Sequence, residues 1–100
     1  MKKNTHSEAV NKLFAAILSL KNEEECYLFF EDICTVNELL SLAQRFEVGT
    51  RLMEKQTYLE ISKATGASTV TISRVSRLLG DSSSGIEMAA ERIGEIHNKD

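Results

Sequence analysis

The chain has 100 residues, 42% of them hydrophobic, and contains no proline, a composition that fits one small, mainly helical domain. Its formal net charge of −3 argues at first against a nucleic-acid partner, but the charges are unevenly distributed. Residues 44–79 hold six basic and three acidic residues, or +3, whereas the remainder holds six basic and twelve acidic residues, or −6. We expect the acidic part to face away from any DNA, and we interpret the charges of the N-terminal helices as an ordinary solvated surface.

Helix starts recur along the chain as a capping residue followed three positions later by glutamate. The pattern occurs at Thr5/Glu8, Asn22/Glu25, Thr35/Glu38, Thr57/Glu60 and Ser84/Glu87, and Ser68 supplies a sixth cap. The sequence therefore predicts six helices, an all-α fold and a single domain spanning 1–100.

Apolar residues at helical spacing predict a buried stripe on three of these helices. The stripes comprise Val10, Leu13, Phe14, Ile17 and Leu18 in the first helix, Leu39, Leu42, Ala43 and Phe46 in the third, and Ile86, Ala89, Ala90 and Ile93 in the last, which we place at 86–97. A linker from Gly80 to Gly85, with the core DSSS, precedes the last helix and is the clearest flexible joint.

The second predicted helix is apolar almost all round, with Cys26, Tyr27, Leu28, Phe29, Phe30 and Ile33. One chain of this length can hardly cover so much apolar surface, so we infer a subunit interface in which the N-terminal helices at 5–33 mediate dimerisation. A central helix wholly buried within the monomer explains the pattern equally well.

Residues 58–79, reading YLEISKATGASTVTISRVSRLL, predict two short helices joined by a sharp turn. Gly66 stands where the first helix must end with a positive φ, and Ser68 can cap the second. Thr65 stands where an apolar residue normally packs. The crossing is supported by the apolar residues Ile61, Ile72 and Val75 and by the small residues Ser62 and Ala67.

The second helix of this pair combines short hydroxyl side chains with guanidinium groups, and no aspartate or glutamate occurs between Gly66 and Gly80. A helix without carboxylates can approach phosphate, so the pattern favours a DNA-binding helix-turn-helix over a purely structural hairpin. The candidate DNA-binding residues are Ser68, Thr69, Val70, Thr71, Ser73, Arg74 and Arg77.

Cys26 and Cys34 form no metal-binding motif, and both histidines stand near the termini. We expect no metal site and two free thiols on a buried face, in a reducing compartment. The N-terminal sequence MKKNTHSEAV lacks the apolar segment of a signal peptide, and no stretch approaches the length of a membrane span. These features predict a cytoplasmic protein with no membrane partner.

The run TVNELLSLAQRFEVGTRLMEKQ followed by TYLEISKATGASTVTISRVSRLL resembles the Trp repressor superfamily and, more closely, its TrpR-like YerC/YecD branch, over about residues 30–80. Members are six-helix, intertwined homodimers that repress transcription, so the resemblance implies that fold, a homodimer and a double-stranded DNA operator. It maps the reading helix onto Ser68–Leu79 and places Thr69, Val70, Thr71, Ser73 and Arg74 at the operator.

The resemblance also identifies possible ligand-binding residues, because Arg45 and Arg74 match the two arginines that hold the corepressor in the tryptophan repressor. Val75 and Leu78, however, replace the glycine and the serine beside that ligand. We therefore do not expect tryptophan as a corepressor or control of the trp operon, and the resemblance does not define another small-molecule effector. The operator should also differ, since charged residues that reach DNA are replaced by Leu59 and Ser62.

Two other function classes remain open. The same helices make a protein-interaction module if the apolar second helix and the acidic remainder recruit a partner while the helix-turn-helix is merely structural. An enzyme is the weaker alternative, because the sequence contains no glycine-rich phosphate loop, no nucleophile near a histidine and no carboxylate pair apart from helix caps. We expect no catalytic residue and no cofactor.

Overall fold

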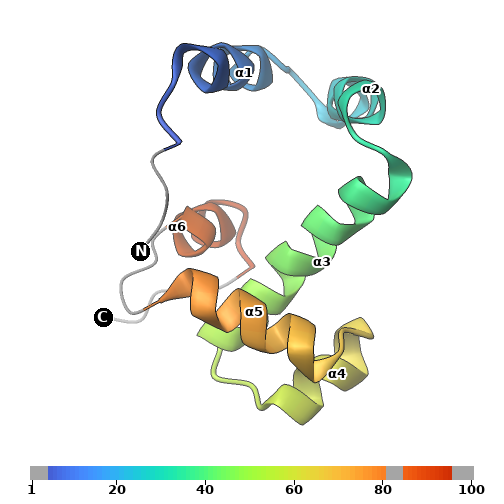
Figure 1. The fold of residues 1–100 in the computed structure, drawn as a ribbon, viewed down its shortest axis with the longest axis vertical. Coiled ribbons are helices and arrows are strands. Elements are labelled where there is room, and N and C mark those ends of the chain that lie inside the picture. The colour runs from blue at the N-terminus through green and yellow to red at the C-terminus, as the bar shows by residue number, and fades with distance from the viewer. Residues whose placement is uncertain (1–4, 81–84, 96–100) are drawn as a thin grey trace. The chain divides into compact units, whose positions relative to one another are not determined.

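The computed structural model describes residues 5–80 and 85–95, which form six α-helices and no strand (Figure 1). This confirms the all-α class and the predicted number of helices. The chain divides into two compact units, an N-terminal unit (Met1–Leu39) and a C-terminal unit (Leu40–Asp100). The helices are α1 (Glu8–Leu18), α2 (Glu23–Ile33), α3 (Val36–Met53), α4 (Tyr58–Thr65), α5 (Thr69–Leu79) and α6 (Gly85–Arg92).

Side-chain caps begin α2 and α3 where the sequence predicts them. The Asn22 carboxamide oxygen accepts a hydrogen bond from the Glu25 backbone N–H at 2.9 Å. At the start of α3, Glu38 N–H donates to Thr35 Oγ1 at 3.1 Å, and Thr35 N–H donates to the Glu38 carboxylate at 2.8 Å. Each bond satisfies a backbone donor that the helix itself leaves unpaired.

The predicted cap of the first helix is wrong by two residues. Ser7 is the capping residue, and its hydroxyl accepts a hydrogen bond from the Val10 N–H at 3.2 Å. The Thr5/Glu8 pattern misled because glutamate at the third helical position is a frequent but dispensable part of a cap. The predicted cap Ser84 and the core of the linker, at 81–84, lie outside the described residues.

The last helix ends at Arg92, so the prediction that it continues to residue 97 is wrong. Gly94 has a φ of 80° and donates its N–H to the Glu91 carbonyl, while the Glu95 N–H donates to the Ala90 carbonyl. These two bonds form a Schellman motif, in which a glycine in the left-handed region closes the helix. A glycine one turn before the end of the predicted helix was the signal for this stop.

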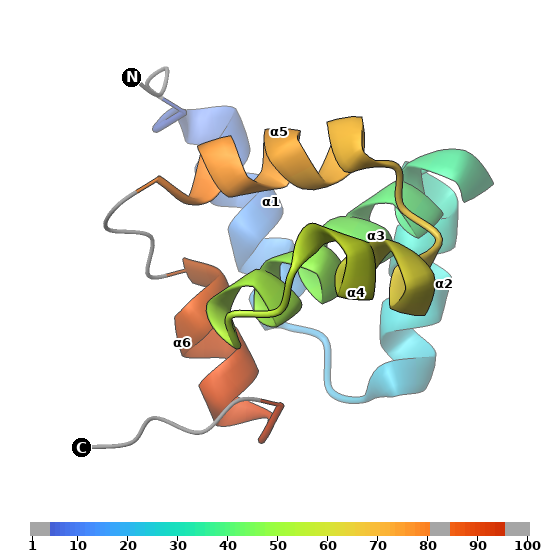
Figure 2. The ribbon, with the colours of Figure 1, turned by 90° about the horizontal axis from the view of Figure 1, so that it is seen from below.

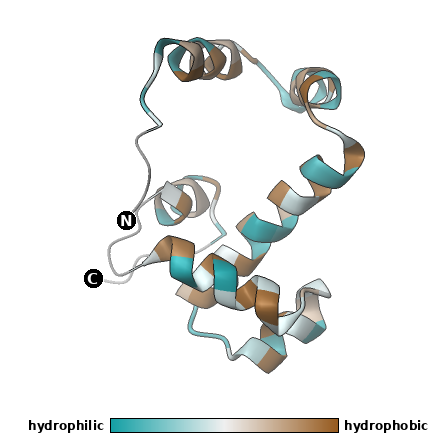
Figure 3. Cartoon of the chain, viewed as in Figure 1, coloured by the Kyte–Doolittle hydropathy of each residue, from teal (hydrophilic) through white to brown (hydrophobic). Residues whose placement is uncertain are grey.

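In the N-terminal unit no residue of α1 or α2 is buried. Hydrophobic residues run along both helices (Figure 3), yet Leu18 is 84% exposed and Leu28 is 66% exposed. The prediction of a buried stripe on α1 is therefore wrong for the single chain, and so is the alternative of a wholly buried central helix. Cys26 is exposed and Cys34 is half-buried, which also contradicts two cysteines on a buried face.

The C-terminal unit has a complete small core. Ile61 of α4, Ile72 and Val75 of α5 and Ala67 of the turn are buried, as the sequence predicts for the crossing. Val48 of α3 is buried with them, although the predicted stripe of that helix did not include it. Figures 1 and 2 show α4 beside α5, with α3 behind the pair. Leu52 and Leu79 pack against this core from its edge.

The C-terminal helix packs against α3 at a glycine. A Cβ atom added at Gly49 would lie 2.8 Å from Ile86 Cδ1 and 3.3 Å from Ile86 Cγ2, so any side chain at this position would force Ile86 to shift. Ala90 is fully buried, whereas Ile93 and, on α3, Leu42 are exposed. The predicted stripes of α3 and α6 are thus only partly buried within the chain.

Candidate nucleic-acid interface

The sharp turn between α4 and α5 has the predicted geometry. Thr57 and Glu60 form a reciprocal capping box, with hydrogen bonds of 3.1 and 2.8 Å, and so fix the start of α4. Gly66 ends α4 with a φ of 78°, and its N–H donates to the Ser62 carbonyl at 2.8 Å. Ser68 then caps α5 by accepting a hydrogen bond from the Thr71 N–H at 3.1 Å.

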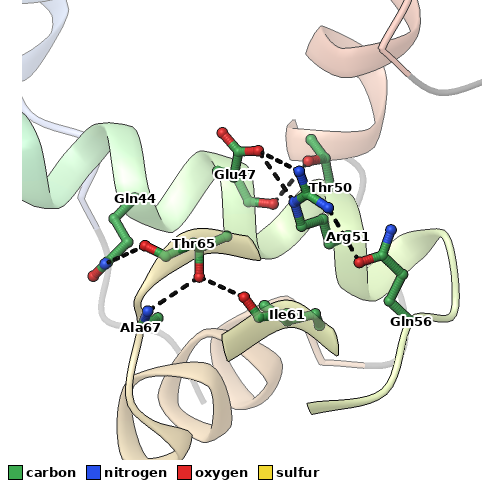
Figure 4. Close-up of polar contacts among 8 residues, drawn as sticks. All are labelled: Gln44, Glu47, Thr50, Arg51, Gln56, Ile61, Thr65 and Ala67. Atoms are coloured by element: carbon green, nitrogen blue, oxygen red, sulfur yellow. Dashed lines mark hydrogen bonds and ion pairs between the residues drawn. The ribbon is translucent and has the colours of Figure 1, made fainter. Parts of the chain in front are cut away.

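Thr65 has a polar role that the sequence did not reveal. Its hydroxyl donates to the Ile61 carbonyl at 2.8 Å and accepts from the Ala67 N–H at 3.1 Å, so it bridges the end of α4 and the turn (Figure 4). The Gln44 side chain of α3 donates to the Thr65 carbonyl at 3.4 Å. A threonine hydroxyl therefore satisfies a backbone N–H that an apolar residue would leave without a partner.

The outward face of α5 carries the main candidates for DNA contact. With Ile72 and Val75 buried, positions i, i+4 and i+7 on the opposite side are Val70, Arg74 and Arg77, and all three are exposed. We call these three residues the outward stripe. Among the other candidates, Ser68 and Thr69 are exposed, and Thr71 and Ser73 are half-buried.

Two of the predicted hydroxyl groups are already engaged within the chain. Ser68 donates to Thr71 Oγ1 at 3.2 Å, in addition to accepting the Thr71 N–H. Their first role is therefore to hold the N-terminal turn of α5 in shape. Thr69 and the outward stripe have no such bond among the described residues, which leaves their side chains available to a partner.

The six cations of residues 44–79 divide into one that forms an ion pair with a residue that the structure describes and five that do not. Arg51 forms an ion pair with Glu47 at 3.0 Å and also donates to Gln56 (Figure 4). In the described ranges, Arg74 and Arg77 form no ion pair, and α5 has no acidic residue. Arg45, Lys55 and Lys63 likewise form no ion pair among the described residues, so α5 carries two of the five unpaired cations of residues 44–79, on a helix without any acidic residue to offset them.

The two arginines expected at a ligand site, Arg45 on α3 and Arg74 on α5, are both exposed, and within the described part of the chain no hydrogen bond joins them. Val75 is 3% exposed and belongs to the core, so the side chain that replaces the family glycine fills space between the helices. Leu78 is exposed.

Neither a metal site nor a membrane helix is visible in the part of the chain that the structure describes. No group of three or more histidine, cysteine, aspartate or glutamate residues lies close enough to hold an ion there. No helix at residues 5–80 or 85–95 combines the length and the apolar character needed to cross a bilayer.

Comparison with known proteins agrees with this architecture. Residues 8–93 match the family model described as Trp repressor protein. The chain is 55% identical over 90 residues to the uncharacterized protein YerC of Bacillus subtilis strain 168, a match that covers 90% of this chain and 86% of YerC.

Two crystal structures are also similar along most of their length. A TrpR-like protein from Eubacterium eligens ATCC 27750 is 54% identical, with a TM-score of 0.84 over 92% of this chain and 95% of that one. A candidate Trp repressor from Staphylococcus aureus is 45% identical, with a TM-score of 0.85 over 93% of each chain. These are relatives in a family of DNA-binding regulators rather than enzymes. The chain therefore belongs to the Trp repressor protein family, in its TrpR-like YerC branch.

Proposed function

We propose that the protein is a sequence-specific transcriptional repressor that acts as a homodimer and inserts α5 into the major groove of double-stranded DNA. The outward stripe is the observation that carries this proposal. It presents two arginines without acidic partners among the described residues, on a helix whose start and orientation are fixed by Ser68 and by the core. Neutralising phosphates with such cations supplies most of the affinity of non-specific DNA binding.

The residues of α5 divide by their distance from the start of the helix. The N-terminal residues of a recognition helix meet base edges, so Thr69, Val70 and Ser73 are the proposed reading residues. Arg77 lies two turns from the cap and is the proposed phosphate contact, and Arg74 lies between them. Losing Arg77 should weaken binding to all sequences, whereas losing Thr69 should relax the preference at one or two base pairs.

Dimerisation through α1 and α2 is supported by their exposed apolar residues. Monomeric proteins rarely leave large contiguous apolar surface in water, and both helices bury nothing fully within the chain. The residues concerned are Phe14, Leu18, Tyr27, Leu28 and Ile33. A single helix-turn-helix contacts few base pairs. A two-fold dimer places two reading helices about one DNA turn apart, so that two half-sites are contacted together.

We propose further that tryptophan is not the effector. The burial of Val75 supports this, since the space that a glycine would leave next to Arg74 is occupied. Isothermal titration with tryptophan should give no binding heat, and tryptophan should leave the affinity for DNA unchanged. Arg45 and Arg74 remain the proposed contacts for any other ligand.

The experiment that tests the function measures binding to a pool of randomised 20-base-pair duplexes at increasing salt. We compare the wild type with the double charge reversal Arg74→Glu/Arg77→Glu. The control, Lys21→Glu/Arg92→Glu, makes the same change in net charge at two exposed residues that lie outside α1, α2 and α5. The wild type and the control should bind with a steep salt dependence, and the α5 variant should lose binding.

The alternative function, a protein-interaction module, gives a different result in the same assay. If the helix-turn-helix is only structural, no duplex is enriched from the pool and binding has no salt slope. The exposed apolar residues of α2 favour that reading only if they contact another protein instead of a second copy of the chain. Equal binding by the α5 variant and the control would also contradict the proposed DNA interface.

A further inference from the structure

Val70 is the one apolar member of the outward stripe, and it stands at the second residue of α5, where a reading helix meets base edges. Its side chain is 59% exposed, and Arg74 follows it four residues later on the same side of the helix. Solvent normally favours a polar side chain at such a position, and the hydroxyls of Thr69 and Ser73 adjoin it. Single exposed aliphatic residues are common on protein surfaces, but at the end of α5 proposed to read DNA such a group can contact an apolar feature of the partner.

The major groove offers one such feature. Each base pair presents a pattern of donors and acceptors, and thymine alone among the four bases adds a C5-methyl group. Uracil has the same donors and acceptors and lacks this methyl. A contact between a valine and a thymine methyl is therefore separable by experiment from every hydrogen bond in the interface.

The side chain of Val70 is also prepared for such a contact. A β-branched valine in a helix holds essentially one rotamer, so its two methyl groups have a defined position before DNA arrives. The Ser68 cap fixes the turn that carries it, through the bond from the Thr71 N–H. Little conformational entropy is lost when such a side chain is covered.

We propose that Val70 recognises the 5-methyl group of a thymine in each operator half-site, an inference that rests on the proposed DNA-binding function. Arg77 holds the helix against the DNA backbone, and Val70 selects thymine over cytosine at one position. The selectivity comes from apolar burial, so it should depend only weakly on salt, unlike the contacts of the arginines.

The test uses the duplex selected from the randomised pool and replaces each of its thymines by uracil, one at a time. For the wild type, each half-site should contain one thymine whose replacement by uracil weakens binding about fourfold. This factor corresponds to the free energy of burying one methyl group. Val70→Ala should bind the thymine and uracil duplexes with affinities that differ by less than about twofold. Alanine favours a helix and replaces an exposed residue, so this variant should fold normally.

The matched control is Thr69→Ala, which truncates the exposed neighbour and leaves Val70 in place. It should retain the full loss on uracil replacement at the same position. The methyl contact would be overturned if uracil had the same effect on the wild type and on Val70→Ala. It would also be overturned if the selected half-sites had no thymine in common. Either result would leave the DNA-binding function intact. If no duplex is enriched from the pool at all, both proposals are wrong.

Discussion

The N-terminal and C-terminal units begin their helices with the same chemistry but differ completely in burial. Asn22 caps α2 and Thr57 caps α4 through the same type of bond, each to the third backbone N–H of its helix. In the C-terminal unit Val48, Ile61 and Ile72 are fully buried, whereas α1 and α2 contain no buried residue. Caps thus determine where a helix begins, but they do not determine whether its apolar face is packed.

This difference has an energetic consequence. Helices of 11 residues, the length of both α1 and α2, are marginal in water unless an apolar face is packed. The C-terminal unit packs its apolar residues within one chain, so its core should persist irrespective of assembly. The N-terminal unit leaves its apolar residues exposed, so we expect its stability to depend on a second chain and therefore on protein concentration.

The largest effect is expected from a truncation in the core of the C-terminal unit. Ile61→Ala removes most of a fully buried side chain and should lower the free energy of unfolding by about 2–5 kcal/mol. Chemical denaturation monitored by circular dichroism measures this loss. Leu59→Ala, two residues away and exposed, should cost less than about 0.5 kcal/mol. Similar losses for both variants would contradict the core described for this unit.

The next prediction tests the other side of the comparison, the exposed leucines. Leu28 on α2 and Leu59 on α4 are each 66% exposed. Leu28→Glu places a charge in the proposed dimer interface and should weaken dimerisation by about 30-fold or more, which corresponds to about 2 kcal/mol. Leu59→Glu should leave the dimer intact. Sedimentation velocity over a range of concentrations distinguishes them, and a wild type that is monomeric at micromolar concentration would refute the interface.

Much of the fold was predictable because it follows from local rules. The cap at Thr57, the positive φ at Gly66 and the cap at Ser68 each depend on a few neighbouring residues, and the structure confirms all three. The apolar anchors of the crossing were predictable as well, since Ile61, Ile72 and Val75 follow from helical spacing once the turn is placed. The exposure of Val70, Arg74 and Arg77 then follows as the opposite side of α5.

What the sequence did not reveal depends on contacts between distant residues or on a second chain. The Gln44 to Thr65 hydrogen bond joins residues 21 positions apart, and no local pattern identifies such a pair. The burial of the α1 stripe failed as a prediction because periodicity shows that a face is apolar and does not show what covers it. The roles of the individual α5 residues at DNA stay predictions for the same reason.

A third prediction separates backbone strain from packing in the turn of the C-terminal unit. A Cβ at Gly66 would meet no atom within 4 Å, so only its φ of 78° opposes substitution. Gly66→Ala should lower the free energy of unfolding by about 1–2 kcal/mol, the usual cost of a left-handed conformation for a residue with a Cβ. Gly66→Asn should cost clearly less, because asparagine tolerates that conformation. Equal costs in denaturation experiments would show that steric crowding, and not φ, constrains the turn.

The smallest effect should be a gain in stability at the end of α3. This helix closes with the same Schellman bonds as α6, from the Lys55 N–H to the Leu52 carbonyl and from the Gln56 N–H to the Arg51 carbonyl. The residue in the left-handed region is a lysine here, with a φ of 66°, whereas α6 has Gly94.

Lys55→Gly relieves the strain of about 1–2 kcal/mol at this φ but makes the unfolded chain more flexible, which offsets about 0.4–1 kcal/mol of it. The net gain should be about 0.5 kcal/mol, measured as a higher midpoint of denaturation with an unchanged slope. Lys55→Ala is the control, because it removes the charge and keeps the strain, so it should give no gain. If both variants were equally stabilised, the source would be removal of the lysine charge, which the two variants share. Backbone strain at residue 55 would then make no measurable contribution to the free energy of unfolding.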